Sequence, residues 1–333
     1  MYHDIDLPLP AFIALDFSAM TLALVPIVLR FYLRWRDPKA QPWSRNLSDG
    51  LVVFAWLSGL VLISINAWKN ALRYRYIHWP AADLFYQVPH DQASHLLYES
   101  WISLYFIYIS LWASKFALIA FFASVLNMMD TSAARRLVAF ASGYALTTFF
   151  LHIILLTRWC DPVSLNWNVD GELCSAVHDI RSVSISTVAN ISTDLVILIL
   201  PIFALTRSSR VRRANTMQMS VSKIEWSGFA LVIAVASLSI VAAAARWITL
   251  WLVHTVPKAD ITHTIDVWAL VEIVASLLAV SLPTLRTFVR KSRRDNQRRV
   301  ESRLRSSTPK RSQSSIWKRP MGFDLDRVES QSV

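Results

Sequence analysis

The chain has 333 residues and a net charge of +11 at pH 7, and its composition is 54% hydrophobic but only 17% charged. Ordinary soluble domains carry about 25% charged residues, so this composition excludes a typical soluble domain and indicates a membrane protein. The positive charge is concentrated at the C-terminus, where Arg290 to Val333 hold 13 Lys or Arg against 5 Asp or Glu.

Seven stretches of the chain are long and apolar enough to cross a membrane as helices, which takes about 20 residues each. They are, in order, residues 11–33, 49–70, 99–126, 135–157, 182–206, 225–253 and 265–288. The alternating short strands of a membrane barrel are not seen in the sequence. We therefore predict an all-α polytopic membrane protein with a short external segment (1–10), a seven-helix domain (11–290) and a disordered basic tail (291–333).

The distribution of basic residues predicts the orientation, because loops on the cytosolic side are enriched in Lys and Arg. The loops after spans 1, 3 and 5 and the tail carry most of them. Outside the tail, these are Arg30, Arg34, Arg36, Lys39, Arg45, Arg135, Arg136, Arg207, Arg210, Arg212, Arg213 and Lys223. We therefore expect an external or lumenal N-terminus and a cytosolic C-terminus.

The chain's two cysteines, Cys160 and Cys174, both fall in the loop between spans 4 and 5. The predicted orientation places this loop outside, where disulfides persist. A closed loop of this size stabilises a fold by roughly 3 kcal/mol in the chain-entropy model. The alternative is a pair of free thiols, and two cysteines without matching histidines do not form a metal site.

An aspartate in the middle of span 5, Asp194, is the least expected residue of the sequence. Ionisable groups at membrane depth cost about 2.5–3.5 kcal/mol each and often mark a functional site. Counting residues from the ends of the spans places Lys115 of span 3 at a similar depth. We predict an ion pair between them, either purely structural or part of a ligand-binding or switching site. Asn190 lies one turn before Asp194 on the same face of its helix.

A second group of polar residues is expected nearer the outside. It comprises Asp16, Asn66, His152, Arg246 and Glu272, contributed by five different spans. One interpretation is an outward-opening ligand pocket, with Asn190, Asp194, Arg246, Glu272 and His152 as the candidate binding residues. The other is a structural salt bridge between Arg246 and Glu272 with hydrogen-bonded neighbours, in which His152 is a packing residue.

Several chemistries are not expected from this sequence. Span 7 has no lysine before Lys291, so it lacks the attachment point for a retinal Schiff base. Nucleotide-binding, zinc-protease and aspartate-rich magnesium motifs are also missing from it. We therefore predict neither a cofactor nor a bound metal.

The tail is rich in Arg and Ser, a composition typical of disorder. Its expected role is a positively charged cytosolic anchor, and an alternative is contact with anionic membrane lipids. Together with the third inner loop it is the expected surface for a cytosolic partner. Nucleic acid is not an expected partner of a tail tethered to a membrane.

Five segments together resemble a known family. They are RFYLRW at the end of span 1, SKFALIAFF in span 3, CDPVSLNW in the outer loop, NISTDLVILILPIFAL in span 5 and WALVEIVASLLAVSLPTLR in span 7. In their order and spacing they resemble the fungal rhodopsin-like seven-helix integral membrane proteins. That group includes the satratoxin-cluster membrane proteins and, more distantly, the Pth-type receptor-like proteins.

The resemblance implies a seven-helix protein without a retinal lysine, and many relatives of this kind accompany secondary-metabolite genes. The positions that carry over are Cys160, Cys174, Lys115, Asn190, Asp194 and Glu272. The loop between spans 2 and 3 lacks the glycine-rich stretch often seen in such proteins, which puts any role of that loop in doubt.

Three functions remain open from the sequence. The first is a receptor-like or accessory membrane protein that binds a lipophilic small molecule and is tied to a secondary-metabolite pathway. The second is a membrane-embedded cyclase or isomerase that uses Glu272, Asp16 or Asp194 as acid or base, which requires a carboxyl group with a raised pKa. The third, a carrier, is the weakest because the chain has no visible inverted repeat.

Overall fold

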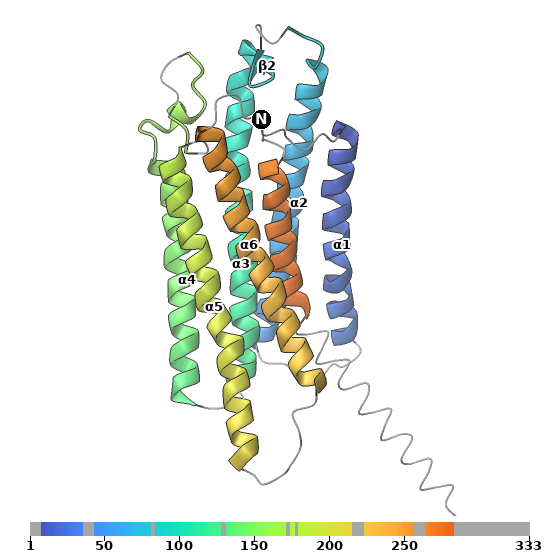
Figure 1. The fold of residues 1–333 in the computed structure, drawn as a ribbon, viewed down its shortest axis with the longest axis vertical. Helices are drawn as coiled ribbons and strands as arrows, with labels where there is room; N and C mark the ends of the chain where they lie inside the picture. Colours follow the sequence, from blue (N-terminus) through green and yellow to red (C-terminus); the bar gives the residue numbers. More distant parts are fainter. Residues whose placement is uncertain are drawn as a thin grey trace, which may run out of the picture. The chain divides into compact units, whose positions relative to one another are not determined.

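The described part of the protein is a bundle of seven helices (Figure 1). The computed structural model describes residues 8–35, 43–80, 84–127, 131–170, 174–176, 179–214, 223–255 and 264–282. Six helices are labelled: α1 (Leu9–Trp35), α2 (Trp43–Arg75), α3 (His90–Asn127), α4 (Ser132–Arg158), α5 (Ile180–Ala214) and α6 (Lys223–Thr255). The seventh helix, Thr264–Leu282, is unlabelled and drawn in dark orange.

Within these ranges, all seven helices are long and apolar enough to span a membrane. The predicted fold class is therefore confirmed, and the chain is a multi-pass membrane protein. The predicted orientation stays a prediction. The predicted tail, 291–333, lies outside the described residues, and α1 begins at Leu9, inside the segment predicted to be external.

Several helices extend beyond the predicted apolar spans, since the polar residues at their ends also adopt helical structure. The prediction that Arg30 lies in a loop is wrong, because it is part of α1 and only 1% exposed. Arg45, Arg135 and Arg136 likewise lie within helices α2 and α4. Hydropathy detects the apolar part of a helix. It does not detect helical ends that contain charged residues, whether these residues form ion pairs or are exposed to water.

Two short elements lie in the connections at one end of the bundle, which we call the disulfide end. Strands β1 (Leu84–Phe85) and β2 (Val88–Pro89) form an antiparallel hairpin between α2 and α3. Its turn residues, Tyr86 and Gln87, have φ angles of 54° and 68°, and tight hairpin turns of one common type need positive φ at both positions. The sequence analysis did not predict this hairpin. Burial raises the pKa of the Tyr86 phenol, so this hydroxyl stays protonated at neutral pH.

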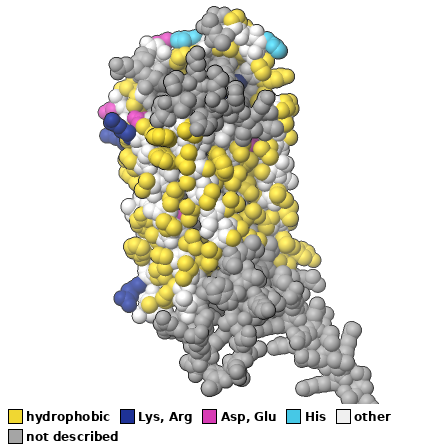
Figure 2. All heavy atoms as spheres, viewed as in Figure 1, with side chains coloured by type: hydrophobic (Ala, Val, Ile, Leu, Met, Phe, Trp, Pro, Cys, Tyr) yellow, Lys and Arg dark blue, Asp and Glu magenta, His cyan; other side chains and the backbone are white. Residues whose placement is uncertain are grey.

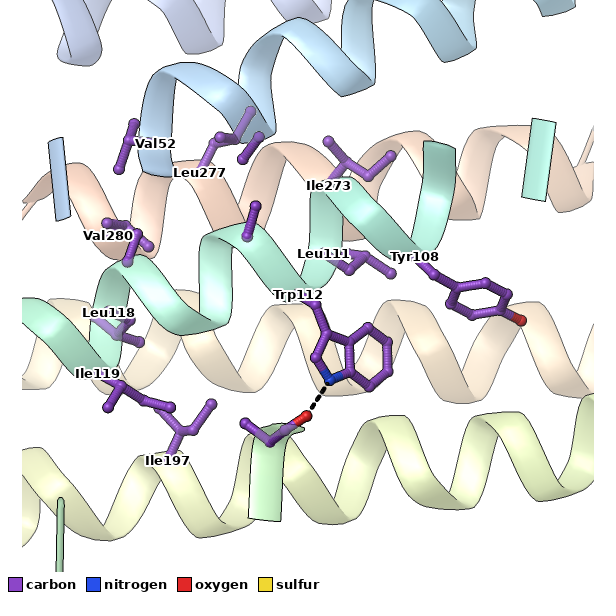
Figure 3. Packing of buried hydrophobic residues seen from close by; sticks show 14 of the residues in the cluster. Val52, Tyr108, Leu111, Trp112, Leu118, Ile119, Ile197, Ile273, Leu277 and Val280 are labelled. Atoms are coloured by element: carbon purple, nitrogen blue, oxygen red, sulfur yellow. Dashed lines mark hydrogen bonds between the residues drawn. The ribbon is translucent and has the colours of Figure 1, made fainter. Parts of the chain in front are cut away.

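Helix α3 forms the centre of the bundle. It packs against α2, α4 and α5. In its most apolar stretch 78% of the span is buried inside the bundle, whereas the corresponding share is at most 56% in the other six spans. Figure 3 shows its buried side chains Leu111, Trp112 and Leu118 among residues of the neighbouring helices, and the Trp112 indole donates a hydrogen bond of 2.8 Å to the Ala145 carbonyl. The described core is thus organised around one helix.

A glycine allows three other helices to approach α2 closely. A Cβ atom at Gly59 would lie 2.8 Å from the Met20 side chain, 3.4 Å from Ile273 and 3.5 Å from the Ser110 hydroxyl. These neighbours belong to α1, the seventh helix and α3. Close approach at small residues is the usual way in which membrane helices gain packing contacts.

The outer surface fits a membrane environment. On the face shown in Figure 2, hydrophobic side chains cover the middle of the bundle, and the visible Lys and Arg side chains lie near its ends. Large apolar side chains such as Leu22, Val188 and Phe150 are more than half exposed. In water such a surface would be a large apolar patch, whereas lipid chains cover it without cost.

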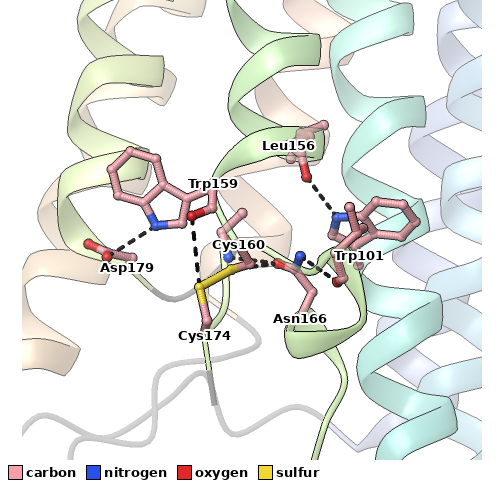
Figure 4. Close-up of a disulfide and its surroundings, with 9 residues drawn as sticks. Trp101, Leu156, Trp159, Cys160, Asn166, Cys174 and Asp179 are labelled. Atoms are coloured by element: carbon pink, nitrogen blue, oxygen red, sulfur yellow. Dashed lines mark hydrogen bonds between the residues drawn. A yellow bond between two sulfur atoms is a disulfide. The ribbon is translucent and has the colours of Figure 1, made fainter. Parts of the chain in front are cut away.

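The predicted disulfide between Cys160 and Cys174 is confirmed. Figure 4 shows how the loop around it is held: the Trp159 indole donates to Asp179, and the Trp101 indole of α3 donates to the Leu156 carbonyl of α4. The Asn166 side chain accepts a hydrogen bond of 3.0 Å from the Ala176 amide. The bridge therefore fixes the connection between α4 and α5 over the disulfide end.

Removing this bridge is expected to destabilise the protein by about 3 kcal/mol, because the unfolded loop regains its freedom. The double variant Cys160→Ser/Cys174→Ser should unfold at a lower temperature than wild type in lipid nanodiscs. Reductant should lower the wild-type midpoint by a similar amount and leave the double variant unchanged, since the chain has only these two cysteines. Equal midpoints for wild type and variant would contradict a stabilising role.

Candidate functional site

An ion pair inside the bundle lies where α3 meets α5. The Lys115 ammonium is 2.8 Å from Asp194 Oδ1, and it donates to Asn190 at both the backbone oxygen (2.9 Å) and Oδ1 (2.7 Å). Asn190 and Asp194 are one turn apart on α5 and therefore present adjacent groups to one partner. The structure thus brings together three residues selected from the sequence.

The contacts continue from α5 to α6 and the seventh helix. The Asn190 side-chain amide donates a hydrogen bond to Glu272 Oε1, and Glu272 Oε2 lies 3.1 Å from Arg246 Nη2. Asn190 therefore links the two ion pairs, since its oxygen accepts from Lys115 and its nitrogen donates to Glu272. We call the five residues Lys115, Asp194, Asn190, Glu272 and Arg246 the central network.

The central network is electrically balanced, with two cations and two carboxylates. All five residues are largely buried, and Glu272 and Asn190 are fully enclosed. Leaving any one of these charges without its partner would cost several kcal/mol, so the four helices that carry them are held in one register. The Lys115 ammonium also lies 4.6 Å from the centroid of the Trp112 ring, a distance typical of a cation–π contact.

A polar and aromatic cluster adjoins the network on its side toward the disulfide end. His152 is fully buried, with its ring centroid 4.5 Å from Tyr108 and 4.3 Å from Trp112. Its nitrogens lie 2.7 Å from the Thr148 carbonyl and 3.1 Å from the Ser186 carbonyl. The Tyr108 hydroxyl hydrogen-bonds the Ser186 hydroxyl at 2.6 Å. Such contacts are those of a well-packed histidine that bridges α4 and α5.

Above this cluster the bundle encloses a cavity of ≈ 190 Å³ at the disulfide end, which we call the upper cavity. Its wall is mostly apolar, with side chains such as Leu104, Ile107 and Leu250. Its charged and polar members include Asn66, Lys69, Arg73, Tyr86, Tyr108, His152, Ser186, Arg246 and Asp266. An apolar wall with a few polar groups is the usual make-up of a small-molecule site, although this one is smaller than the ~300–1,000 Å³ of drug-sized pockets.

The candidate binding residues are placed in different ways around this cavity. Arg246 and His152 lie on its wall. Glu272 and Asn190 do not line it; Glu272 pairs with Arg246, and Asn190 donates a hydrogen bond to Glu272. Asp194 instead borders a smaller cavity of ≈ 40 Å³ between α3, α5, α6 and the seventh helix. That volume suffices for a water molecule.

The structure does not place Asp16, the remaining candidate acid, on either cavity wall. It is buried in α1, with Asp266 of the seventh helix near enough for electrostatic repulsion. Of the charged residues on the wall of the upper cavity, Lys69, Arg73 and Asp266 were not singled out from the sequence. Lys69 lies near the end of α2 and is 8% exposed. Its three-residue spacing from Asn66 on the same helix was the available signal.

A second buried charge cluster lies toward the opposite end of the bundle. Arg30 of α1 pairs with Asp49 of α2 at 2.6 Å, and donates to the Ser48 hydroxyl (2.8 Å) and to the Val280 carbonyl of the seventh helix (2.9 Å). Ser48 in turn donates to the Ala117 carbonyl of α3 at 2.7 Å. Four helices therefore meet at this Arg30 cluster. Sequence reasoning missed it because Arg30 was counted as a loop charge and Asp49 as the first residue of a span.

The comparisons with known proteins decide the family. The family model of the fungal rhodopsin domain matches residues 29–291. The chain belongs to the fungal rhodopsin domain family. No curated protein and no solved structure matches it significantly.

The match confirms the resemblance seen in the sequence and covers most of the fungal rhodopsin-like bundle. The central network, the disulfide, the Arg30 cluster and the upper cavity all fall within residues 29–291. Asp16 precedes the matched segment.

The Lys115–Asp194 pair should behave as one unit in stability measurements. Lys115→Met or Asp194→Asn alone is expected to destabilise the protein by about 3–5 kcal/mol, since each leaves a buried charge uncompensated. The double variant should lose much less than the sum of the two, and a double-mutant cycle in nanodiscs measures the difference. Arg158→Met, which removes an exposed charge at the end of α4, serves as the control. Additive losses in the cycle would show that the two residues do not interact.

Proposed function

We propose that this fungal rhodopsin-like protein is a receptor-like or accessory membrane protein that binds a lipophilic small molecule in the upper cavity. The observation that carries the proposal is that Arg246 belongs both to the wall of this cavity and to the central network. A molecule in the cavity would touch Arg246, which pairs with Glu272. Glu272 in turn accepts a hydrogen bond from Asn190, and Asn190 accepts one from Lys115. Binding there would act on the contacts that hold α3, α5, α6 and the seventh helix together.

The alternative of a cyclase or isomerase receives less support from the same geometry. An acid catalyst in an apolar pocket needs a carboxyl group that is protonated and open to the substrate. Asp194 and Glu272 each lie within ion-pair distance of a cation, 2.8 Å from Lys115 and 3.1 Å from Arg246. Neither residue lines the upper cavity, so a substrate bound there would not reach either carboxyl group.

Three further elements of the proposal come from the sequence. The external position of the disulfide end follows from the distribution of Lys and Arg, and it would open the upper cavity toward the outside or the lumen. The link to a secondary-metabolite pathway follows from the family resemblance. A cytosolic partner at the third inner loop and the basic tail follows from their charge. Residues 215–222 of that loop lie outside the described part of the chain.

Ligand binding should be visible as stabilisation that depends on the cavity. A lipophilic ligand present at 100 times its dissociation constant stabilises a protein by about 2.7 kcal/mol. We expect hits from a panel of lipophilic compounds to raise the unfolding temperature of the wild type in nanodiscs and to lose this effect in Ala269→Phe, which fills the cavity. Val188→Phe, on the lipid-facing side of α5, should respond as wild type does. Equal responses in all three proteins would mean that the compounds act on the bilayer and would refute the proposal.

Metabolite profiles of a deletion strain separate binding from catalysis. For a receptor-like or accessory protein, deletion should lower the products of a whole pathway together or leave the chemistry unchanged. An enzyme would instead leave one accumulating intermediate, removed by wild type but not by a stably expressed Glu272→Gln or Asp194→Asn variant. Arg158→Met provides the expression-matched control, and the second pattern would replace our proposal with the alternative.

A further inference from the structure

The Lys69 side chain poses a question that the proposed function does not answer. Lys69 is 8% exposed and lines the upper cavity. Among the described residues, none forms a hydrogen bond or an ion pair with its ammonium group. The other buried cations of the bundle, Arg30, Lys115 and Arg246, each have a carboxylate partner. A buried ammonium group without a partner is costly, so its position facing a cavity calls for an explanation.

The acidic groups around Lys69 act on it only from a distance. Asp266 of the seventh helix and Glu99 of α3 both attract it electrostatically, but neither pairs with it within 4.0 Å. Asp266 shares the cavity wall, and Glu99 does not. Asp16 lies close enough to Asp266 to repel it. The acidic groups near the ammonium therefore leave a place for a closer anionic partner.

The charge balance of the wall favours an anion as well. Three basic side chains, Lys69, Arg73 and Arg246, line the upper cavity, with Asp266 as the acidic residue among the described members. Arg246 is compensated by Glu272 at 3.1 Å. Lys69 is then the basic side chain of this wall for which the described residues supply no ion-pair partner. The other wall residues are neutral hydroxyl and amide groups, His152, or apolar side chains such as Leu97 and Ile265.

We propose that the upper cavity binds the anionic group of an amphipathic molecule, with Lys69 as its counter-ion and the apolar wall holding its hydrocarbon part. A carboxylate, phosphate or sulfate on a short apolar chain meets both requirements. The inference rests on the proposed function, because it names the class of ligand for the same cavity. The anion has two possible sources, a free amphiphile or an anionic lipid of the surrounding bilayer.

The test compares three probes that share one hydrocarbon chain and differ only in charge: octanoate, octanol and octylamine. Each is titrated against the purified full-length protein in phosphatidylcholine nanodiscs, with the unfolding temperature as readout. The Ala269→Phe protein gives the baseline for partition into the bilayer. We expect wild type to bind octanoate at least tenfold more tightly than octanol, and octylamine more weakly than octanol.

Two substitutions at Lys69 isolate its charge. Lys69→Met keeps a side chain of similar length and removes the charge, so octanoate should bind it no better than octanol does, while octanol binding stays unchanged. Lys69→Arg keeps the charge and should retain the preference for octanoate. Lys69→Met breaks no ion pair within 4.0 Å among the described residues and Lys69→Arg keeps the charge, so both variants are expected to fold, and their midpoints without probe verify this.

The outcomes separate this inference from the proposed function. Cavity-dependent binding in which octanol or octylamine equals octanoate, or in which Lys69→Met weakens all probes alike, overturns the anion site and leaves the proposed function standing. No cavity-dependent binding of any probe or panel compound overturns both. Replacing part of the phosphatidylcholine by phosphatidylglycerol identifies the source. Stabilisation that requires Lys69 without added octanoate assigns the anion to a bilayer lipid, and no such stabilisation assigns it to a free amphiphile.

Discussion

The paired charges at the centre of the bundle are the interaction on which the rest of the structure depends. An isolated charge at membrane depth costs about 2.5–3.5 kcal/mol on insertion scales, and this bundle buries four of them in one connected set. Lys115, Asp194, Arg246 and Glu272 come from four different helices, and Asn190 joins the two pairs. Helices in lipid gain little from apolar contact alone, so these contacts define how α3, α5, α6 and the seventh helix are placed against each other.

The Arg30 cluster completes this arrangement by bringing in α1 and α2. The seventh helix takes part in both clusters, through the Glu272 side chain and through the Val280 carbonyl. These two positions are eight residues apart, or about 12 Å along a helix. The seventh helix is thus held at two heights by different neighbours. Helix α3 also contributes to both clusters, with Lys115 in the central network and the Ala117 carbonyl in the Arg30 cluster. A change in the upper cavity that loosened Arg246 from Glu272 would leave the Asn190–Glu272 hydrogen bond and the Arg30–Val280 contact holding the seventh helix.

The sequence predicted the parts of this structure that follow from composition and periodicity. Runs of apolar residues located all seven helices, and the unusual cost of Asp194 in such a run directed attention to Lys115 at the same depth. The disulfide followed from two cysteines in one predicted outer loop. These inferences succeed because each depends on a property of one segment or on a simple count of residues along it.

The sequence did not predict what depends on how helices rotate against each other. Asp16, Asn66, Arg246 and Glu272 were assigned to one layer from their depth, but depth does not tell which face of a helix they occupy. Asn66 and Arg246 face the upper cavity, whereas Glu272 lies behind Arg246. Arg30 was counted as a loop charge and Lys69 was not singled out, and only the assembled bundle shows that both are buried. Both residues lie near one end of a predicted apolar span, and hydropathy does not tell whether a charge at that position faces water or a neighbouring helix.

The arrangement of charge signs around the upper cavity connects the fold to its proposed use. Cations line the cavity, at Lys69, Arg73 and Arg246, while Glu272 is turned away from it and Asp194 borders the smaller cavity. A molecule in the upper cavity therefore meets three basic side chains and the Asp266 carboxylate, whereas neither network carboxylate lines that wall. This polarity suits the binding of an anionic group and is unsuited to proton donation by either carboxylate. Arg246 lies on the wall that would recognise the ligand and also belongs to the network that holds four helices together. Ligand recognition and helix packing therefore depend on the same residue.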